Sequence, residues 1–126
     1  MLRREQELRI ADLRSSSIYK EFKQASVNEE INISSTNSPE KWILLREAID
    51  KAYPFFIEHI HLIYPHLSST EEQVCLLTKL GIPPSGIATI QKCTRQCISN
   101  IRTRIHKRIQ SFGGKYSNFD DFIDSF

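Results

Sequence analysis

The fold is decided by residues 67–109, which read LSSTEEQVCLLTKLGIPPSGIATIQKCTRQCISNIRTRIHKRI. Ser68 and Glu71 have the spacing of a capping box, in which each side chain accepts a hydrogen bond from a free backbone N–H of the other residue. Gly81 stands where a helix C-cap needs left-handed backbone, and the Pro-Pro pair that follows cannot continue a helix. The stretch therefore predicts a helix and then a short break. The residues expected to face inward are Val74, Cys75, Leu77 and Leu80.

Two further helices are expected after this break. Ser85 restarts a helix in which Ile87, Ala88 and Ile90 are expected to be buried, and Ala88 is small enough for a close helix crossing. Thr94 can cap the last helix, which we place at about 94–109. Apolar residues recur in that helix at spacings of three and four and form one uncharged stripe. The stripe consists of Ile98, Ile101, Ile105, Ile109 and Phe112.

The side of the last helix opposite this stripe is polar and carries no acidic residue. At 100° per residue, amides, hydroxyls and one lysine point most directly away from the stripe. These residues are Gln96, Ser99, Asn100, Thr103 and Lys107, with Arg95, Arg102 and His106 on one flank and Arg104 and Arg108 on the other. A helix that reads base edges in a DNA groove needs short hydrogen-bonding side chains between cations that bind phosphates.

The charge of the chain is unevenly distributed. The net charge is only +2, yet seven Lys/Arg and no Asp or Glu fall between Ser85 and Lys115. Such a block indicates an acidic partner surface, although charge alone leaves open a basic helix that merely faces solvent. A solvated helix face more often pairs Glu with Lys at i, i+4, so the absence of acids favours nucleic acid.

Composition predicts one all-α domain. The 126 residues are 40% hydrophobic, which is enough for a single modest core, and Gly and Pro are scarce. Three cysteines without framework spacing predict buried thiols in a reducing compartment. No run approaches the roughly 18 apolar residues of a membrane span, and the first residues lack the apolar region of a signal peptide. We therefore expect a soluble, cytoplasmic chain, whose opening Met could equally be a start inside a longer protein.

Residues 1–26 are expected to form a helical segment with coiled-coil character. Residues 2–14 favour helix but have few apolar positions, so this helix is expected to fray or to pair with a copy of itself. Ile18 and Phe22 mark a second short helix to about Ala25. Residues 27–38 are polar, lack periodicity and are expected to form a linker.

Residues 39–112 are expected to form the globular helical bundle. Ser38-Pro39-Glu40 is a strong helix start, and Tyr53-Pro54 ends that helix, with Pro54 able to open the next one. We interpret the apolar stripes of both helices as core. The first is Trp42, Leu45, Ala48, Ile49 and Ala52, and the second is Phe56, Ile57, Ile60 and Ile63.

Residues 113–126 are expected to form a break and a short C-terminal helix. The aromatic face is Phe119, Phe122, Ile123 and Phe126, and the acidic face is Asp120, Asp121 and Asp124. Such a short helix is not stable alone, so we expect its aromatic face to pack on the domain, against Phe22, Trp42 or Phe56. The alternative is docking onto a partner subunit.

No residue pattern indicates catalysis. Cys93-x-x-x-Cys97 with His106 lacks a fourth metal ligand, and His59 and His61 point in different directions on a helix. There is no nucleophile–base signature and no Gly-rich phosphate loop. We therefore expect no catalytic residue, metal, cofactor or small-molecule substrate, and no enzyme activity.

The stretch 67–109 resembles the LuxR-type helix-turn-helix without a gap. The residues that carry the resemblance are Leu67-Ser68, Glu71, Val74 to Leu80, Gly81, Ile87-Ala88, Thr94, Ile98 and the run from Lys107 to Ile109. Region 4 of sigma factors shares much of this pattern and is a weaker match. The flanking SSSIYKEF, the W…AIDKAYPFF…YPHLS module and FDDFIDSF resemble the C-terminal end of Bacteroidetes regulators, in which a tetratricopeptide sensor and a transmembrane helix precede the DNA-binding domain.

The resemblance implies a tetrahelical DNA-binding domain of a transcriptional regulator, whose full-length parent is tethered to the inner membrane. It implies base contacts from Gln96, Ser99, Asn100 and Thr103; the phosphate contacts we expect are Lys92, Thr94, Arg95, Arg102, Arg104 and Lys107. Ser99 and Thr103 replace lysines frequent in the family, and Ile101 replaces a histidine, so base preference does not transfer. Few phosphate contacts bind weakly, so we expect a homodimer on a two-fold DNA site, formed through the N-terminal or C-terminal helices. The other function we carry is a helical protein-interaction module, for example one that contacts RNA polymerase.

Overall fold

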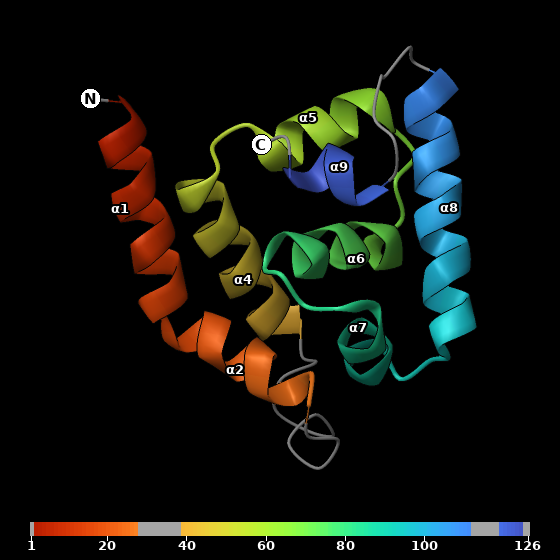
Figure 1. Cartoon of the computed structure of the whole chain (residues 1–126), viewed down its shortest axis with the longest axis horizontal. Coiled ribbons are helices and arrows are strands. Elements are labelled where there is room, and N and C mark those ends of the chain that lie inside the picture. Colours follow the sequence, from red (N-terminus) through yellow and green to blue (C-terminus); the bar gives the residue numbers. More distant parts are fainter. Residues whose placement is uncertain (1, 28–38, 112–118, 125–126) are drawn as a thin grey trace.

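The computed structural model of the chain describes residues 2–27, 39–111 and 119–124, and these form eight helices without a strand (Figure 1). The expected all-α helical bundle is confirmed. The helices are α1 (Leu2–Ser15), α2 (Ser17–Ala25), α4 (Pro39–Ala52), α5 (Phe56–Ile63), α6 (Ser69–Lys79), α7 (Pro84–Gln91), α8 (Arg95–Ser111) and α9 (Phe119–Asp124). Residues 28–38, Phe112, Gly113-Gly114 and Phe126, on which several expectations rest, lie outside the described residues.

Helix α6 is the centre of the bundle and contacts α4, α7, α8 and α9. Helix α8 lies along one side of the molecule and α1 along the opposite side, where it packs against α4 (Figure 1). The capping box that starts α6 is present, because Ser68 Oγ accepts from Glu71 N and Glu71 Oε1 accepts from Ser68 N, both at 3.1 Å. Gly81 follows with φ 85°, as its place in the sequence predicts.

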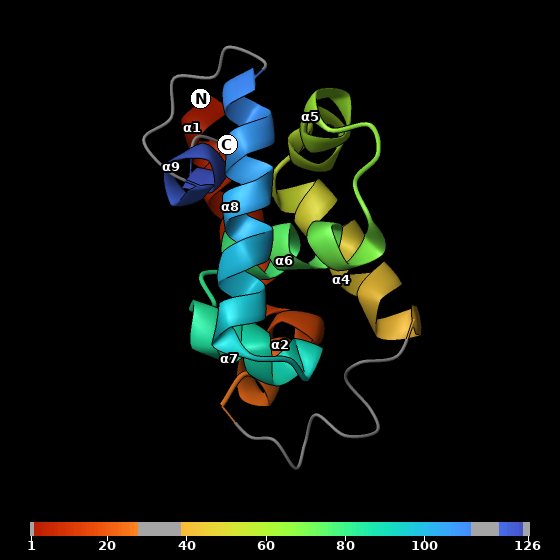
Figure 2. The same ribbon diagram turned by 90° about the vertical axis from the view of Figure 1, so that its right-hand side faces the viewer.

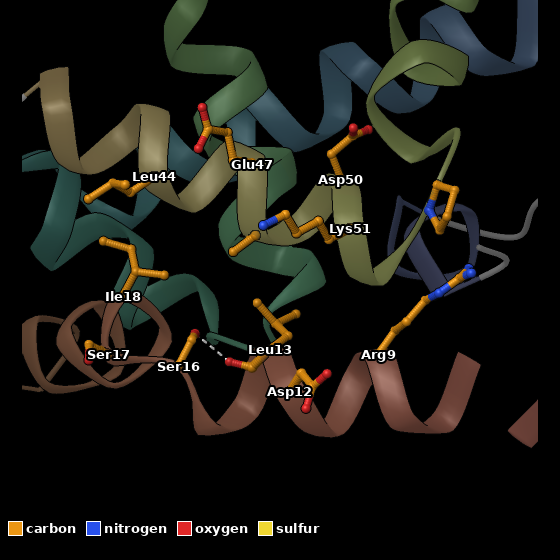
Figure 3. A pocket seen from close by; sticks show the side chains of 12 residues that line it. Arg9, Asp12, Leu13, Ser16, Ser17, Ile18, Leu44, Glu47, Asp50 and Lys51 are labelled. Carbon is orange, nitrogen blue, oxygen red and sulfur yellow. Dashed lines mark hydrogen bonds between the residues drawn. The ribbon is translucent and has the colours of Figure 1, made fainter. Parts of the chain in front are cut away.

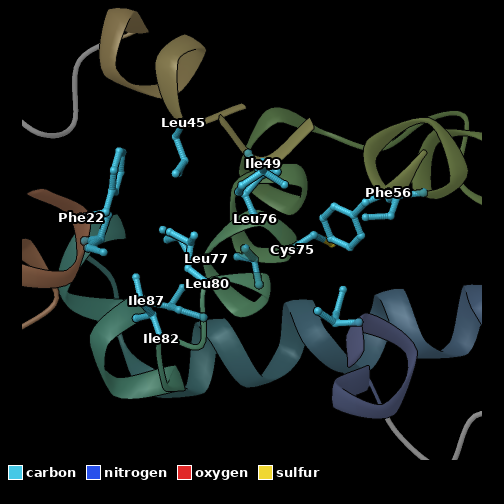
Figure 4. Close-up of a cluster of buried hydrophobic side chains, with 14 of the residues drawn as sticks. Phe22, Leu45, Ile49, Phe56, Cys75, Leu76, Leu77, Leu80, Ile82 and Ile87 are labelled. Atoms are coloured by element: carbon cyan, nitrogen blue, oxygen red, sulfur yellow. The ribbon is translucent and has the colours of Figure 1, made fainter. Parts of the chain in front are cut away.

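One hydrophobic core joins the N-terminal segment to the rest of the chain. Phe22 of α2 is fully buried, and its ring centroid lies 4.7 Å from that of Trp42 in α4. Leu45 and Ile49 continue the core towards Leu77 of α6 (Figure 4). Helix α1 contributes Leu13 to the same core, whereas Leu8 is exposed. The segment boundary expected near residue 26 therefore coincides with the end of α2, and the hydrophobic core includes residues on both sides of it.

Two helix starts differ from the sequence prediction. Helix α5 begins at Phe56 and not at Pro54, because Phe55 adopts a left-handed backbone with φ 77° and interrupts the chain. Helix α7 begins at Pro84, one residue before Ser85, and Pro83 takes the cap position. Proline suits the first position of a helix because the N–H it lacks would have no helical partner there.

Helix α9 packs on α6 and α8, with Phe119, Phe122 and Ile123 buried. Phe22 lies at the opposite end of the core (Figure 4), so the expectation that Phe22 or its neighbour Trp42 supports α9 is wrong. Lys79 connects α9 to the region of Phe56. Its Nζ donates to the Ile123 carbonyl at 3.0 Å and lies 5.7 Å from the Phe56 ring centroid.

The cysteines differ in exposure. Cys75 is buried as expected, but Cys93 is half-buried and Cys97 is exposed, so the prediction of three buried thiols is wrong. Cys97 is in the first turn of α8 and is open to solvent. Within the described ranges, no helix has both the length and the apolar character required to cross a membrane.

Candidate nucleic-acid interface

The outward face of α8 is open to solvent. Ile98, Ile101, Ile105 and Ile109 are all buried against the bundle, which turns the opposite side of the helix outward. Figure 2 shows α8 in front of the other helices, with its long axis fully in view. We call the exposed residues opposite the stripe the outer ridge. They are Gln96, Ser99, Asn100, Thr103 and Lys107.

The two amides of the outer ridge are hydrogen-bonded to each other. Gln96 Nε2 donates to Asn100 Oδ1 at 2.9 Å, one helical turn apart. Both side chains are exposed, so each retains further donors or acceptors that face solvent. This contact orders a pair of hydrogen-bonding groups in the N-terminal half of the ridge.

The turn before α8 places further polar groups beside this ridge. Thr94 Oγ1 accepts a hydrogen bond from Cys97 N at 3.1 Å, so the expected helix cap is present and occupies the hydroxyl as an acceptor. Lys92 adopts a left-handed backbone with φ 56° at the end of α7 and is exposed. Arg95 opens α8 and is exposed, and neither cation has an acidic partner in the part of the chain that the structure describes.

Arg104 is held by a carboxylate of α6. Its Nε lies 3.4 Å from Oε2 of Glu71, whose other oxygen completes the capping box with Ser68. The Arg104 side chain remains 60% exposed, whereas that of Glu71 is 8% exposed. Burial and the adjacent Glu71 carboxylate raise the pKa of Tyr64. One carboxylate therefore fixes the start of α6 and the middle of α8 together.

Arg102, also expected to bind phosphate, is engaged by α9. Its Nη2 lies 2.5 Å from Oδ2 of Asp120, and its guanidinium carbon lies 5.4 Å from the Phe119 ring centroid. Only 20% of the Arg102 side chain is exposed. The sequence prediction did not pair the acidic residues of 119–124 with the basic helix. The sequence does contain a hint of such a pair, because a segment whose only charges are acidic follows one whose only charges are basic.

A notch of about 220 Å³ separates α8 from α9. Ser99 and Thr103 of the outer ridge line it together with Arg102, His106 and Phe119. The face that carries the candidate base-reading residues is therefore continuous with α9. The structure brings all the expected base-reading residues onto one surface, with Arg102 at its edge.

The comparisons with known proteins add no relative. No protein-family model, curated protein or solved structure matches this chain.

A second hollow lies far from α8. A groove of about 830 Å³ runs between α1 and α4, and Figure 3 shows Leu13, Ile18 and Leu44 directed into it. Its rim carries both charges, with Arg9 and Lys51 alongside Asp12, Glu47 and Asp50. This mixed rim lacks the uniform positive charge of the α8 face, so we keep the groove separate from the candidate interface.

One histidine, His61, forms part of a polar cluster between helices. His61 Nε2 and Arg46 Nε lie 2.6 and 3.1 Å from the two carboxylate oxygens of Glu72, which joins α4, α5 and α6. Glu72 thus bridges an arginine of α4 and a histidine of α5. In the described part of the molecule, no three His, Cys, Asp or Glu side chains gather around a position that could hold a metal.

Proposed function

We propose that this chain is a sequence-specific DNA-binding domain of a bacterial transcriptional regulator and that α8 enters the major groove. The observation that carries the proposal is the outer ridge, where exposed amides and hydroxyls stand between cations on a helix without any acid. A major groove admits one α-helix, and its base edges present donors and acceptors to such side chains.

The arrangement of α6, α7 and α8 supports this proposal. These three helices contact one another pairwise, and α8 is the last and longest of them. In a helix-turn-helix the final helix reads the groove while the earlier one crosses the DNA backbone. The chain is in this respect similar to LuxR-type domains, which we take as the working family.

The proposed roles divide by chemistry. Gln96, Ser99, Asn100 and Thr103 face base edges, while exposed cations contact phosphates on either side. Beside the outer ridge, the cations for which the described residues offer no acidic partner are Lys92, Arg95 and Lys107. Thr94 and Arg104 add a hydroxyl and a partly exposed guanidinium. So few phosphate contacts favour two copies on a two-fold site.

Duplex binding as a function of salt tests the proposal. A fluorescent random duplex measures the general electrostatic term, and a sequence selected from a random pool by repeated binding measures specificity. We expect log K to fall linearly with log salt, and the selected site to bind at least about a thousandfold more tightly than the random duplex. The double variant Arg95→Ala/Lys107→Ala should lower the salt slope by roughly two phosphate contacts.

Lys20→Ala is the matched control, because Lys20 is an exposed cation of α2, away from α8. It should leave affinity and slope unchanged. The competing function is a protein-interaction module in which α8 meets an acidic protein face. Absence of duplex binding at low salt, also in a covalently linked dimer, would refute the DNA proposal and favour that module.

A further inference from the structure

The pairing of Arg102 differs from that of the other cations on α8. Its partner Asp120 comes from α9, a six-residue helix with three aspartates and no base. Phe119, Phe122 and Ile123 are buried and hold α9 in place, while the Asp120 side chain remains 56% exposed. A carboxylate is thus fixed at the edge of the face proposed to meet DNA phosphates.

The guanidinium of Arg102 is incompletely satisfied by this partner. Asp120 contacts Nη2, whereas Nε is buried and lacks a hydrogen-bond partner within the described residues. His106 Nδ1, from the same notch, is also buried without a partner there. Buried polar atoms normally have partners, so the Arg102 Nε–H marks a place where an acceptor is missing.

We propose that the notch between α8 and α9 is an anion site, in which a backbone phosphate of bound DNA displaces the carboxylate of Asp120 from Arg102. The inference rests on the proposed function and adds a contact to it. Ser99 and Thr103 of α8 line the notch together with Arg102, and each can offer a hydroxyl donor to an anion. A phosphate offers several oxygens and can bind an arginine through two nitrogens at once, whereas Asp120 uses one.

Asp120 can be displaced from Arg102 by a phosphate with only a small loss of free energy. Its side chain is more than half exposed, so the displaced carboxylate regains water while α9 stays anchored through its buried face. The exchange involves no net gain of ion pairs, because one is broken for the one that forms. Asp120 therefore lowers the affinity for DNA, because it competes with the phosphate for Arg102. Helix α9, which carries Asp120, thereby tunes that affinity.

The test compares two substitutions that remove the same charge from the same helix. Asp120→Asn releases Arg102, and we expect duplex binding to tighten roughly two- to fivefold, the range for one exposed ion pair. The salt slope should change little, since Arg102 makes the same phosphate contact in both complexes. Asp124→Asn should tighten binding less, because Asp124 is exposed and the ion-pair partner of Arg102 is Asp120.

Arg102→Gln supplies the second arm. Combined with Asp120→Asn, it should abolish the gain in affinity, and circular dichroism should report an unchanged helix content in all variants. Equal effects of Asp120→Asn and Asp124→Asn would overturn the inference and leave general charge repulsion as the cause. A gain that survives Arg102→Gln would overturn it as well. Wild-type protein that binds no duplex would instead refute the proposed function, and the anion exchange with it.

Discussion

Gln96 Nε2 donates a hydrogen bond of 2.9 Å to Oδ1 of Asn100 on the exposed face of α8. The contact leaves the Gln96 carbonyl oxygen and the Asn100 amino group free to face solvent. One acceptor and one donor side by side match the edge of adenine, which presents an amino donor and a ring-nitrogen acceptor in the major groove. The pair therefore predicts an adenine within the bound sequence.

Asn100→Ala should weaken binding selectively. We expect a loss of about 1–3 kcal/mol on the selected site, confined to one or two base pairs, and little change on random duplex. Lys107→Ala should weaken both duplexes alike and reduce the salt slope by about one. Dissociation constants of both variants on both duplexes check this. The same proportional loss from each variant would contradict the division into base-reading and phosphate-binding residues.

Gly86 should be the least replaceable small residue of α7. A Cβ at this position would lie 2.8 Å from Ile82 Cγ2 and 2.9 Å from Ser26 Cβ, so Gly86→Ala forces α2 and α7 apart. We expect a destabilisation of about 1–3 kcal/mol, measured by denaturant unfolding. Ser85→Ala is the control, since Ser85 is exposed and should change stability little. Similar losses for both variants would contradict close packing at Gly86.

Replacement of Lys92 by glycine should raise the stability of the fold and lower its affinity for DNA. Its left-handed backbone, with φ 56°, is unfavourable for a residue with a side chain, so Lys92→Gly should stabilise the fold by up to about 1 kcal/mol. The same variant loses a cation beside the outer ridge and should bind DNA more weakly. Lys92→Gln keeps the backbone strain and should show only the loss of binding. A stability gain in Lys92→Gln would exclude backbone strain as the cause.

Cys75 should make stability fall at alkaline pH. Burial, helped by Glu71 and Glu72, raises the pKa of its thiol far above the usual value of about 9. The unfolded chain then releases a proton that the folded chain retains, so stability is full below pH of about 9 and declines above it. The limit is about 1.4 kcal/mol per pH unit. Cys75→Ala, followed by urea unfolding across this range, should lack that decline; parallel curves for the two proteins would contradict it.

Local features of this fold could be predicted from the sequence. The capping box at Ser68, the left-handed Gly81 and the Thr94 cap each depend on a few neighbouring residues, and all three are present. The isoleucine stripe of α8 was predictable because its helical period repeats through buried Ile98, Ile101, Ile105 and Ile109. The outward direction of the opposite ridge follows from the same period.

Features that depend on contacts between distant segments were not predictable. Periodicity identified the apolar face of α9 but not which helices it covers, so the Arg102–Asp120 pair was missed. The close approach at Gly86 depends on α2, which is sixty residues away in the chain. Phe55 adopts positive φ although nothing in its residue type favours it, and the break before α5 shifted as a result.

The burial of Phe22 against Trp42 sets a minimum length for the folding unit. A fragment that starts at residue 39 would lack Phe22 and expose Trp42 to solvent. Ser16 caps α2, and α1 before it adds Leu13 to the same interior, so a fragment that retains the complete interior includes α1 as well. A force or rotation applied to α1 would consequently be transmitted to the hydrophobic core, because Leu13 of α1 is part of that core.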